Sequence, residues 1–376
     1  MEHPEAGGAE VIIFEIMQRL AAQGHAITLL TGEFPGGAAR TRVGGAEVHR
    51  TGNQYSFNFA APAYYRKHLK PKGFDVIVED VNKIPFFMPR HEPEVPTVAV
   101  VPHLFGTTVF QQASFPLASY VYLYERFIPA VYGRGLFSVL SESTRDDLVS
   151  RGIPADRLRI IHGGMDHGLY TPDGRMPAER PNWIVYLGRL KKYKGIDLIL
   201  RALPEISRSV PDVLYKIVGE GDDRPRLEEL TRRLGMEKHV EFTGYVGGQD
   251  KVKLLRDTRI LAYTSPKEGW GLSVIEAGAC AVPVVASDSP GLRESVVHGQ
   301  TGFLAPHGDV AALAAHCTTL LTDNALAERF ARAGVEWAAR FNWDESTRKT
   351  LALLEEAVAE RRAAPGAPHL MRTGVI

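Results

Sequence analysis

Apolar residues along the chain follow two alternating patterns. Short β-branched runs at 25–32, 74–80, 95–103 and 136–143 are separated by longer stretches in which apolar residues recur every three or four positions, at 9–24, 61–70 and 118–132. The short runs predict buried strands and the longer stretches predict helices. Alternation of this kind is typical of an α/β fold with a parallel sheet.

The second half of the chain repeats the alternation with clearer boundaries. Strands are expected at 183–189, 213–221, 240–246, 259–265, 282–288 and 301–305, and helices at 195–209, 223–235, 248–257, after Gly271 and at 291–297. A Gly- and Pro-rich stretch precedes this half. We therefore predict two doubly wound domains facing a cleft, at 1–165 and 183–340, joined by a linker at 166–182. A helix at 341–364 is expected to pack back on the first domain, followed by a tail at 365–376.

The start of the chain differs from the pattern expected of a doubly wound domain. Such a domain opens with a strand, whereas "MEHPEAGGAE" leads directly into the first predicted helix. The first strand normally lies at the centre of the sheet. Its absence predicts an open central gap, unless the sheet closes or another segment fills it. We expect that the start was placed too late and that an apolar run lies upstream.

Composition narrows the class of protein. A length of 376 residues suits two domains, and 44% hydrophobic with 23% charged residues is ordinary for a globular protein. Lys+Arg and Asp+Glu are both 44, so no overall charge favours nucleic acid. Cys280 and Cys317 fall in apolar helical patterns and are predicted to be buried thiols, as in a reducing, cytoplasmic compartment. No apolar run is long enough to span a bilayer, and no signal peptide is recognised.

Several polar residues follow the predicted strands, at the sheet edge where α/β folds bind ligands. In isolation each has an ordinary interpretation, such as a solvated loop for the basic residues or a first-turn acid favoured by the helix dipole. Together they suggest a site for an anion. The residues are His103, Arg189, Lys194, Glu268 and Glu294, with Gly7 and Gly8 before the first helix.

The stretch "EGWGLSVIE" adds a helix start and a second carboxylate. Backbone amides of Trp270, Gly271 and Leu272, which follow Gly269, are expected to point at phosphate oxygens. Glu276 lies among apolar residues and needs a hydrogen-bond donor, such as a ligand hydroxyl. This combination predicts a diphosphate site next to a sugar and a ribose. A dinucleotide fingerprint is absent, because "GEGDDR" has Arg224 where a third glycine is required.

At this point the sequence resembles a known family. "PEAGGAE", "GRLKKYKGID", "EGWGLSVIEAGACAVPVVASDSPGLRE" and "FNWDEST" are similar to the retaining glycosyltransferases of family four, which have the two-Rossmann GT-B fold. The resemblance implies that Glu268 lies beside the donor sugar and that Glu276 accepts hydrogen bonds from the ribose. It implies that Arg189 and Lys194 neutralise the donor diphosphate and that Gly8 belongs to a loop closing over the phosphates. His103 would lie near the sugar hydroxyls, and Glu294 matches an acid of less defined role.

The resemblance implies transfer of a hexose from GDP-mannose or a UDP-hexose to a glycan or lipid-linked acceptor, without a cofactor or an obligatory metal. The alternatives are a sugar-nucleotide epimerase of the same fold and an inactive, truncated transferase. Most aromatic residues of the segment 110–133 are expected in the core, and contact with an acceptor or a lipid is the alternative for them. The basic and aromatic segment "YYRKHLKPK" at 64–72 suggests peripheral contact with an anionic membrane, although a solvated helix end is the simpler interpretation.

Overall fold

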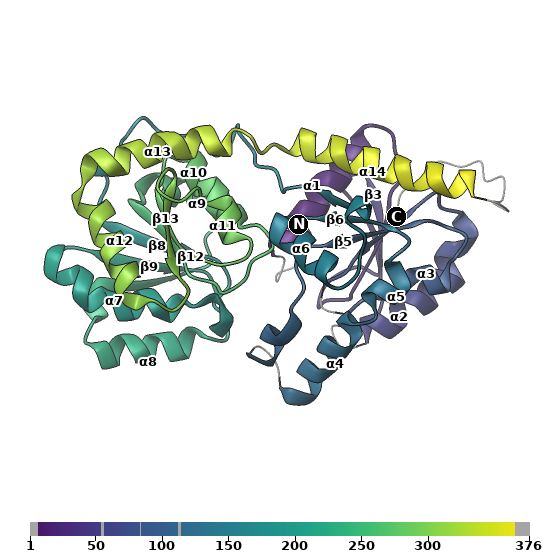
Figure 1. Cartoon of the computed structure of the whole chain (residues 1–376), viewed down its shortest axis with the longest axis horizontal. Helices are drawn as coiled ribbons and strands as arrows, with labels where there is room; N and C mark the ends of the chain where they lie inside the picture. Colours follow the sequence, from purple (N-terminus) through teal and green to yellow (C-terminus); the bar gives the residue numbers. More distant parts are fainter. Residues whose placement is uncertain (1–6, 54–55, 83, 112–113, 365–376) are drawn as a thin grey trace. The chain divides into compact units, whose positions relative to one another are not determined.

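The strands form three sheets, which belong to two structural units (Figure 1). The computed structural model describes residues 7–53, 56–82, 84–111 and 114–364. Unit 2 is Met165–Asn342, and unit 1 comprises the residues on either side of it. Each unit has its own hydrophobic core.

Unit 2 is built on a six-stranded parallel sheet with the order β10-β9-β8-β11-β12-β13. Every residue of β11 is buried, as expected for a strand covered on both faces. The strands are β8 (Trp183–Leu187), β9 (Leu214–Val218), β10 (Val240–Gly244), β11 (Ile260–Tyr263), β12 (Val284–Asp288) and β13 (Gly302–Pro306). The helices are α7 (Ile196–Ser209), α8 (Arg224–Leu234), α9 (Gly248–Asp257), α10 (Leu272–Ala279), α11 (Leu292–Ser295), α12 (Val310–Thr322) and α13 (Asn324–Ala338).

Unit 1 carries its strands in two separate sheets. One has the order β1 (Thr28–Thr31), β3 (Ala46–Arg50), β2 (Arg40–Val43), and the other the order β4 (Ile77–Asp80), β5 (Thr97–Val101), β6 (Leu136–Val139), β7 (Leu158–Ile160). All pairs are parallel except β2 with β3. β1 and β4 are therefore end strands, and within the described residues no ladder joins them.

The helices of unit 1 include one from the far end of the chain. α14 (Trp343–Ala363) packs against α1 (Gly8–Ala22) and lies on β5 and β6. Leu353 and Leu354 of α14 share a core with Met17 and Leu20 of α1. The others are α2 (Phe57–Tyr64), α3 (Met88–His91), α4 (Phe115–Glu125), α5 (Ile128–Tyr132) and α6 (Glu142–Ser150).

The structure corrects one predicted boundary. Residues 166–182 belong to unit 2 and do not form a separate linker. Arg180 in this stretch is buried, and its guanidinium donates hydrogen bonds to the carbonyls of Thr258, Cys280 and Ala281. These bonds tie the stretch to the carboxyl ends of α9 and α10 and give the buried guanidinium hydrogen-bond partners in place of water.

Two helix predictions also change. The stretch 118–132 is two helices, α4 and α5, and 61–70 is the end of α2 followed by a single π-helical turn at Tyr65–Leu69. Cys280 and Cys317 are free and buried, as predicted. Within the described part of the chain, no helix is long and apolar enough to cross a bilayer.

Candidate active site

The carboxyl edge of the unit 2 sheet collects most of the predicted residues. β8 and β12 both pair with β11, so the loops that follow these three strands leave the sheet side by side. Arg189 follows β8, Glu268 follows β11 and Glu294 lies on α11 after β12. The parallel topology therefore brings together residues that are up to a hundred positions apart.

A buried ion pair is the centre of this edge. Lys194 Nζ lies 2.6 Å from Glu268 Oε1, and the two side chains are only 9% and 14% exposed. Lys194 ends a short 3₁₀ turn after β8, and Glu268 lies in the loop after β11. Charges are rarely buried unless they are paired. The two charges are therefore held by each other in a buried position, and Lys194 is not a solvated loop residue.

Aromatic rings enclose the lysine. Its ammonium lies 5.0 Å from the ring centroid of Tyr193 and 5.7 Å from that of Tyr263, and Tyr263 stacks on Tyr186. Burial lowers the pKa of Lys194, but the negative charge of Glu268 and the electron-rich tyrosines outweigh this and raise the pKa above its usual value. Lys194 therefore stays a cation throughout the physiological pH range.

Two glycines allow the loops to approach each other this closely. Gly195 has φ +67°, and a Cβ there would lie 2.5 Å from the carbonyl oxygen of Thr264, at the end of β11. Gly291 has φ +80°, and a Cβ there would lie 2.2 Å from the carbonyl oxygen of Glu268. The amide of Glu268 in turn donates to the carbonyl of Pro290. Only glycine fits both the backbone conformation and the space.

Arg189 and the start of α10 provide further groups for an anion. Arg189 is exposed, and its side chain has no ion-pair partner within the described part of the chain. α10 begins at Leu272 after Gly271, with no side chain capping its first amides. Amides at a helix start favour negative charge. The indole of Trp270 is buried against Phe341, so this side chain anchors the loop to the core of unit 2.

Glu276 is partly buried, as predicted, but it has protein partners. Its Oε2 lies 2.6 Å from Lys251 Nζ of α9, and its carboxylate also hydrogen-bonds Tyr170. Burial, followed by the charge of Glu276, raises the pKa of Tyr170, which keeps the phenol protonated. Neither Lys251 nor Tyr170 was predicted as a partner of Glu276, because neither residue is close to Glu276 along the chain.

The remaining predicted residues of unit 2 line the same loops. Glu294 is half-buried on α11, four residues after Pro290, which accepts the hydrogen bond from Glu268. Gly269 and Leu272 are half-buried on either side of Trp270 and Gly271. Glu268 is therefore in direct contact with Lys194 and Pro290, and the other predicted residues of this unit lie on the segments that follow β8, β11 and β12.

Unit 1 holds Gly8 and His103 at the corresponding edge of its own sheet. Gly8 is the first residue of α1 and is exposed, and the preceding Gly7 amide donates to Glu10 Oε2 at 2.9 Å. His103 follows β5, is half-buried and packs its ring against Phe105 with centroids 4.8 Å apart. Both lie where strand ends and a helix start leave polar groups available to a ligand.

Asp80 is a third residue at this edge, and sequence reasoning missed it. It ends β4, next to β5, and its Oδ1 is closed off from solvent with no hydrogen-bond partner among the described residues. Burial, together with the charges of Glu10 and Glu79, raises the pKa of Asp80 to about 7. The acidic end of "FDVIVED" was the available signal, because a strand that is otherwise apolar ends in two carboxylates.

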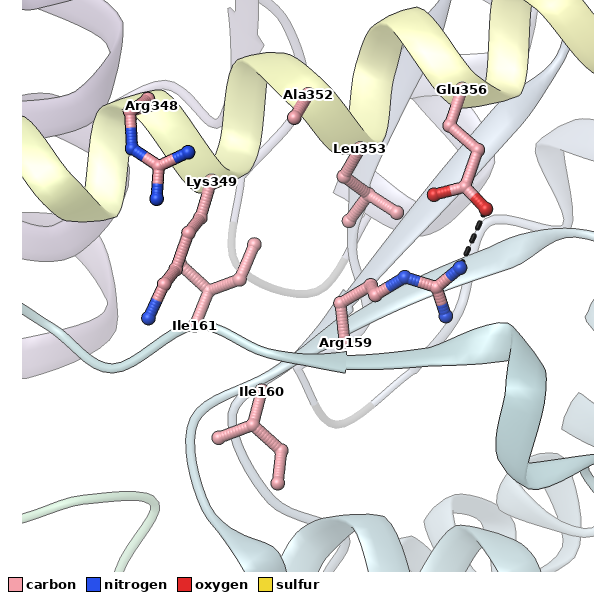
Figure 2. Close-up of a pocket in the computed structure, with 8 residues that line it drawn as sticks. All are labelled: Arg159, Ile160, Ile161, Arg348, Lys349, Ala352, Leu353 and Glu356. Atoms are coloured by element: carbon pink, nitrogen blue, oxygen red, sulfur yellow. Dashed lines mark hydrogen bonds and ion pairs between the residues drawn. The ribbon is translucent and has the colours of Figure 1, made fainter.

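A groove elsewhere in unit 1 holds none of the predicted residues. It has a volume of about 270 Å³ and lies between β7 and α14 (Figure 2). Figure 2 shows Arg159 bonded to Glu356 across one end. The nitrogen and oxygen of this ion pair lie 2.5 Å apart, and Arg348 is paired with Glu345 at 2.7 Å. Because these cations already have carboxylate partners, the groove is not a candidate anion site.

Comparison with known proteins identifies the family. Residues 175–337 match the model described as glycosyl transferases group 1, and residues 6–169 match the model of glycosyltransferase family 4. The two matches are consecutive and together extend over most of the chain. The chain belongs to this glycosyltransferase family.

Curated relatives match this chain over only part of their own length. The GDP-mannose-dependent alpha-(1-6)-phosphatidylinositol monomannoside mannosyltransferase of Mycolicibacterium smegmatis is 34% identical over 60% of this chain and 62% of that protein. The glycogen synthase of Mycobacterium tuberculosis is 32% identical over 56% of this chain and 51% of that protein. The matched regions are therefore less than two thirds of these relatives.

Solved structures establish the fold of the glycosyltransferase. A sucrose-phosphate synthase of Thermosynechococcus elongatus aligns with a TM-score of 0.79 at 22% identity, covering 94% of both chains. The Anabaena protein HepE, solved with UDP and glucose, aligns with a TM-score of 0.75 at 20% identity, covering 95% of this chain and 98% of that one. The predicted GT-B fold, with two doubly wound α/β units, is confirmed.

Proposed function

We propose that this glycosyltransferase moves a hexose from a nucleotide-diphosphate sugar to a glycan or lipid-linked acceptor, with retention at the anomeric carbon. The observation that carries the proposal is the buried Lys194–Glu268 pair at the carboxyl edge of the unit 2 sheet. A diphosphate suits three groups at this edge: the charged ammonium of Lys194, the exposed guanidinium of Arg189 and the uncapped start of α10. Carboxylates beside them are suited to hydroxyl groups.

The chemistry follows from where charge develops. Breaking the bond between the sugar and the phosphate leaves an oxocarbenium-like sugar and a diphosphate with additional negative charge. Lys194, Arg189 and the first amides of α10 stabilise that leaving group, and one such donor is typically worth roughly a hundredfold to a thousandfold in rate. Retention arises either by front-side attack assisted by the departing phosphate or by way of a covalent intermediate.

Each remaining site residue has a role in binding in this proposal. Glu268 lies beside the donor sugar and Glu276 receives the ribose hydroxyls, displacing part of its contact with Lys251. Glu294, Gly269 and Leu272 shape the loop around the phosphates. In unit 1, His103 contacts sugar hydroxyls and the loop at Gly8 approaches the phosphates. Of these residues, His103, Arg189, Lys194 and Glu268 are the proposed catalytic groups.

The names of the relatives support a hexose donor without defining its base. One relative is named as GDP-mannose-dependent, and HepE was solved with UDP and glucose. Glycogen synthase and a phosphatidylinositol mannoside mannosyltransferase also differ in their acceptors. Both GDP-mannose and UDP-hexoses therefore belong in a donor screen.

The test is a thermal-shift panel of nucleotide sugars followed by product analysis. A bound donor raises the unfolding temperature by mass action. Transfer predicts a glycosylated product only when acceptor is present, whereas an epimerase would convert the donor without acceptor. Donor binding without any product would identify an inactive protein.

Membrane contact through 64–72 is a narrower proposal than the sequence suggested. Tyr65 is buried, and the hydroxyl of Tyr64 lies 2.9 Å from His49 Nδ1, so neither ring is directed to a membrane. Lys70 is paired with Glu92 and Lys72 with Glu47. Arg66 and Lys67 remain exposed, and we propose that, of the cations in this segment, these two face an anionic bilayer. Such a protein would act in the cytoplasm, at the inner face of the membrane.

A further inference from the structure

An exposed apolar surface surrounds α4 of unit 1. Phe115 is 76% exposed, Leu117 49% and Leu123 53%, and the flanking Phe110 and Phe127 are 40% and 48% exposed. We call these five residues the α4 surface. The prediction that aromatic residues of this segment lie mostly in the core is wrong for its three phenylalanines. Isolated exposed apolar residues are common, but a group of five on one short segment indicates a binding surface.

The orientation of α4 explains the exposure. Its buried residues, Ala118, Val121 and Glu125, recur at helical spacing and form the face that packs on unit 1. The outward face of a surface helix is normally polar. Here that face carries Phe115 and Leu123 and has no charged residue, while Leu117 is exposed at the border of the buried face. Figure 1 shows α4 at one border of unit 1, with α14 along the opposite border.

The charges of the segment favour a particular partner. Between residues 95 and 141 the only acid is Glu125. Glu125 is buried, and its carboxylate accepts hydrogen bonds from the amides of Phe105 at 2.6 Å and Gly106 at 2.8 Å. The segment's only Lys or Arg residues, Arg126 and Arg134, are exposed. It therefore presents apolar side chains and cations to solvent but no carboxylate.

This combination matches the chemistry of an anionic bilayer. Apolar and aromatic side chains enter the boundary between headgroups and acyl chains, while cations remain at the phosphates. We propose that the α4 surface inserts into the interface of an anionic phospholipid membrane, with Arg126 and Arg134 at the headgroups. The inference rests on the membrane contact included in the proposed function. It adds the α4 surface as the apolar part of that contact.

Vesicle sedimentation tests the inference on the full chain. The probes are vesicles of phosphatidylcholine alone and of phosphatidylcholine mixed with phosphatidylglycerol. The wild type should bind the mixed vesicles more tightly. Phe115→Ser combined with Leu123→Ser should weaken binding roughly thirtyfold, because two exposed apolar side chains no longer enter the interface. Arg126→Glu should weaken binding to mixed vesicles only.

Tyr245→Ser is the matched control, since Tyr245 is an aromatic residue of unit 2 with 81% exposure. It should leave vesicle binding unchanged. Equal binding by the wild type and the Phe115→Ser/Leu123→Ser variant would overturn the inference. So would a change from dimer to monomer in that variant without any effect on vesicles, because the surface would then join two copies of the chain.

The nucleotide-sugar thermal shift separates this inference from the proposed function. The Phe115→Ser/Leu123→Ser variant should keep the wild-type shift, because the two substituted side chains are exposed and are not among the proposed donor-binding residues. If no nucleotide sugar shifts the wild type but vesicle binding depends on the α4 surface, the proposed donor activity fails and the membrane surface stands. If a nucleotide sugar shifts the wild type but vesicle binding does not depend on the α4 surface, the membrane inference fails and the proposed donor site stands.

Discussion

At the scale of single residues, the site combines one buried ion pair with an exposed cation. Lys194 and Glu268 neutralise each other in the absence of a ligand, whereas Arg189 is exposed. The types and positions of these residues were predicted from sequence. Their pairing was not, because the two are 74 positions apart and meet only through the neighbouring strands β8 and β11.

The pair should contribute to stability as well as to binding. Lys194→Ala leaves the Glu268 carboxylate buried without its partner, so we expect a loss of about 3–5 kcal/mol in the free energy of unfolding. Combining Lys194→Ala with Glu268→Gln should recover about 1–3 kcal/mol relative to the sum of the single changes. Urea unfolding of the four proteins in the cycle measures this coupling. Strictly additive losses would show that the pair does not act as a unit.

Arg189→Ala is the complementary variant. Because Arg189 is exposed and its side chain has no ion-pair partner in the described part of the chain, its removal should change the unfolding temperature little. It should weaken nucleotide-sugar binding roughly tenfold or more, since a charge-assisted contact to phosphate is lost. Calorimetric titration of the accepted donor provides the measurement. A variant that unfolds early but binds normally would assign Arg189 to structure.

Asp80 should give unit 1 a pH-dependent stability. Its pKa is raised from 3.8 to about 7 in the folded state, so folding favours the protonated carboxyl. This contribution is present below pH 4 and is lost as the pH rises to about 7, amounting to roughly 4 kcal/mol at most. Asp80→Asn, which stays neutral, should remove that part of the pH dependence and stabilise the protein at pH 8. If the free energy of unfolding changes with pH in the same way for the two proteins between pH 5 and 8, Asp80 is not the group responsible.

At the scale of elements, the apolar pattern identified most of the buried strands but missed three strands. β2 lies at the edge of its sheet and alternates exposed and half-buried residues, with arginine at two of its four positions. β3 is the central strand of that sheet and is mostly buried, but its sequence AEVHR carries Glu47, His49 and Arg50 and therefore does not form an apolar run. β7 has only three residues. Hydrophobic periodicity is weak in strands that are short or lie at an edge. The boundaries of α7, α8 and α9 were predicted to within one residue because each of these helices has one clear apolar face.

Two glycines test whether loop geometry positions the site. Gly291→Ala would place a Cβ 2.2 Å from the carbonyl oxygen of Glu268, so the loop must shift. Gly299→Ala is the matched control, because Gly299 has φ +74° with nothing within 4 Å of the added Cβ. We expect the control to cost about 1–2 kcal/mol from its backbone conformation alone. Gly291→Ala should cost more and should also weaken donor binding; equal effects of the two variants would show that the close approach is unimportant.

At the scale of the whole molecule, the two doubly wound α/β domains were predicted from the alternation of strands and helices, and the GT-B fold was implied by the resemblance to the family. The sequence did not predict that 166–182 belongs to unit 2, because this depends on hydrogen bonds from Arg180 to carbonyls 78 to 101 residues away. No local pattern reports such bonds. The exposure of the α4 surface was equally hidden, since an apolar helix has the same composition whether it is buried or exposed.

Donor binding tests the central claim most directly. The measurement is the change in unfolding temperature of the wild type and of Arg189→Ala across a panel of GDP- and UDP-hexoses and their free nucleotides. We predict that one nucleotide sugar stabilises the wild type in a concentration-dependent way and that the effect is much smaller in Arg189→Ala. No stabilisation of the wild type by any member of the panel, at concentrations that saturate glycosyltransferases, would contradict a nucleotide-sugar site at the carboxyl edge of unit 2.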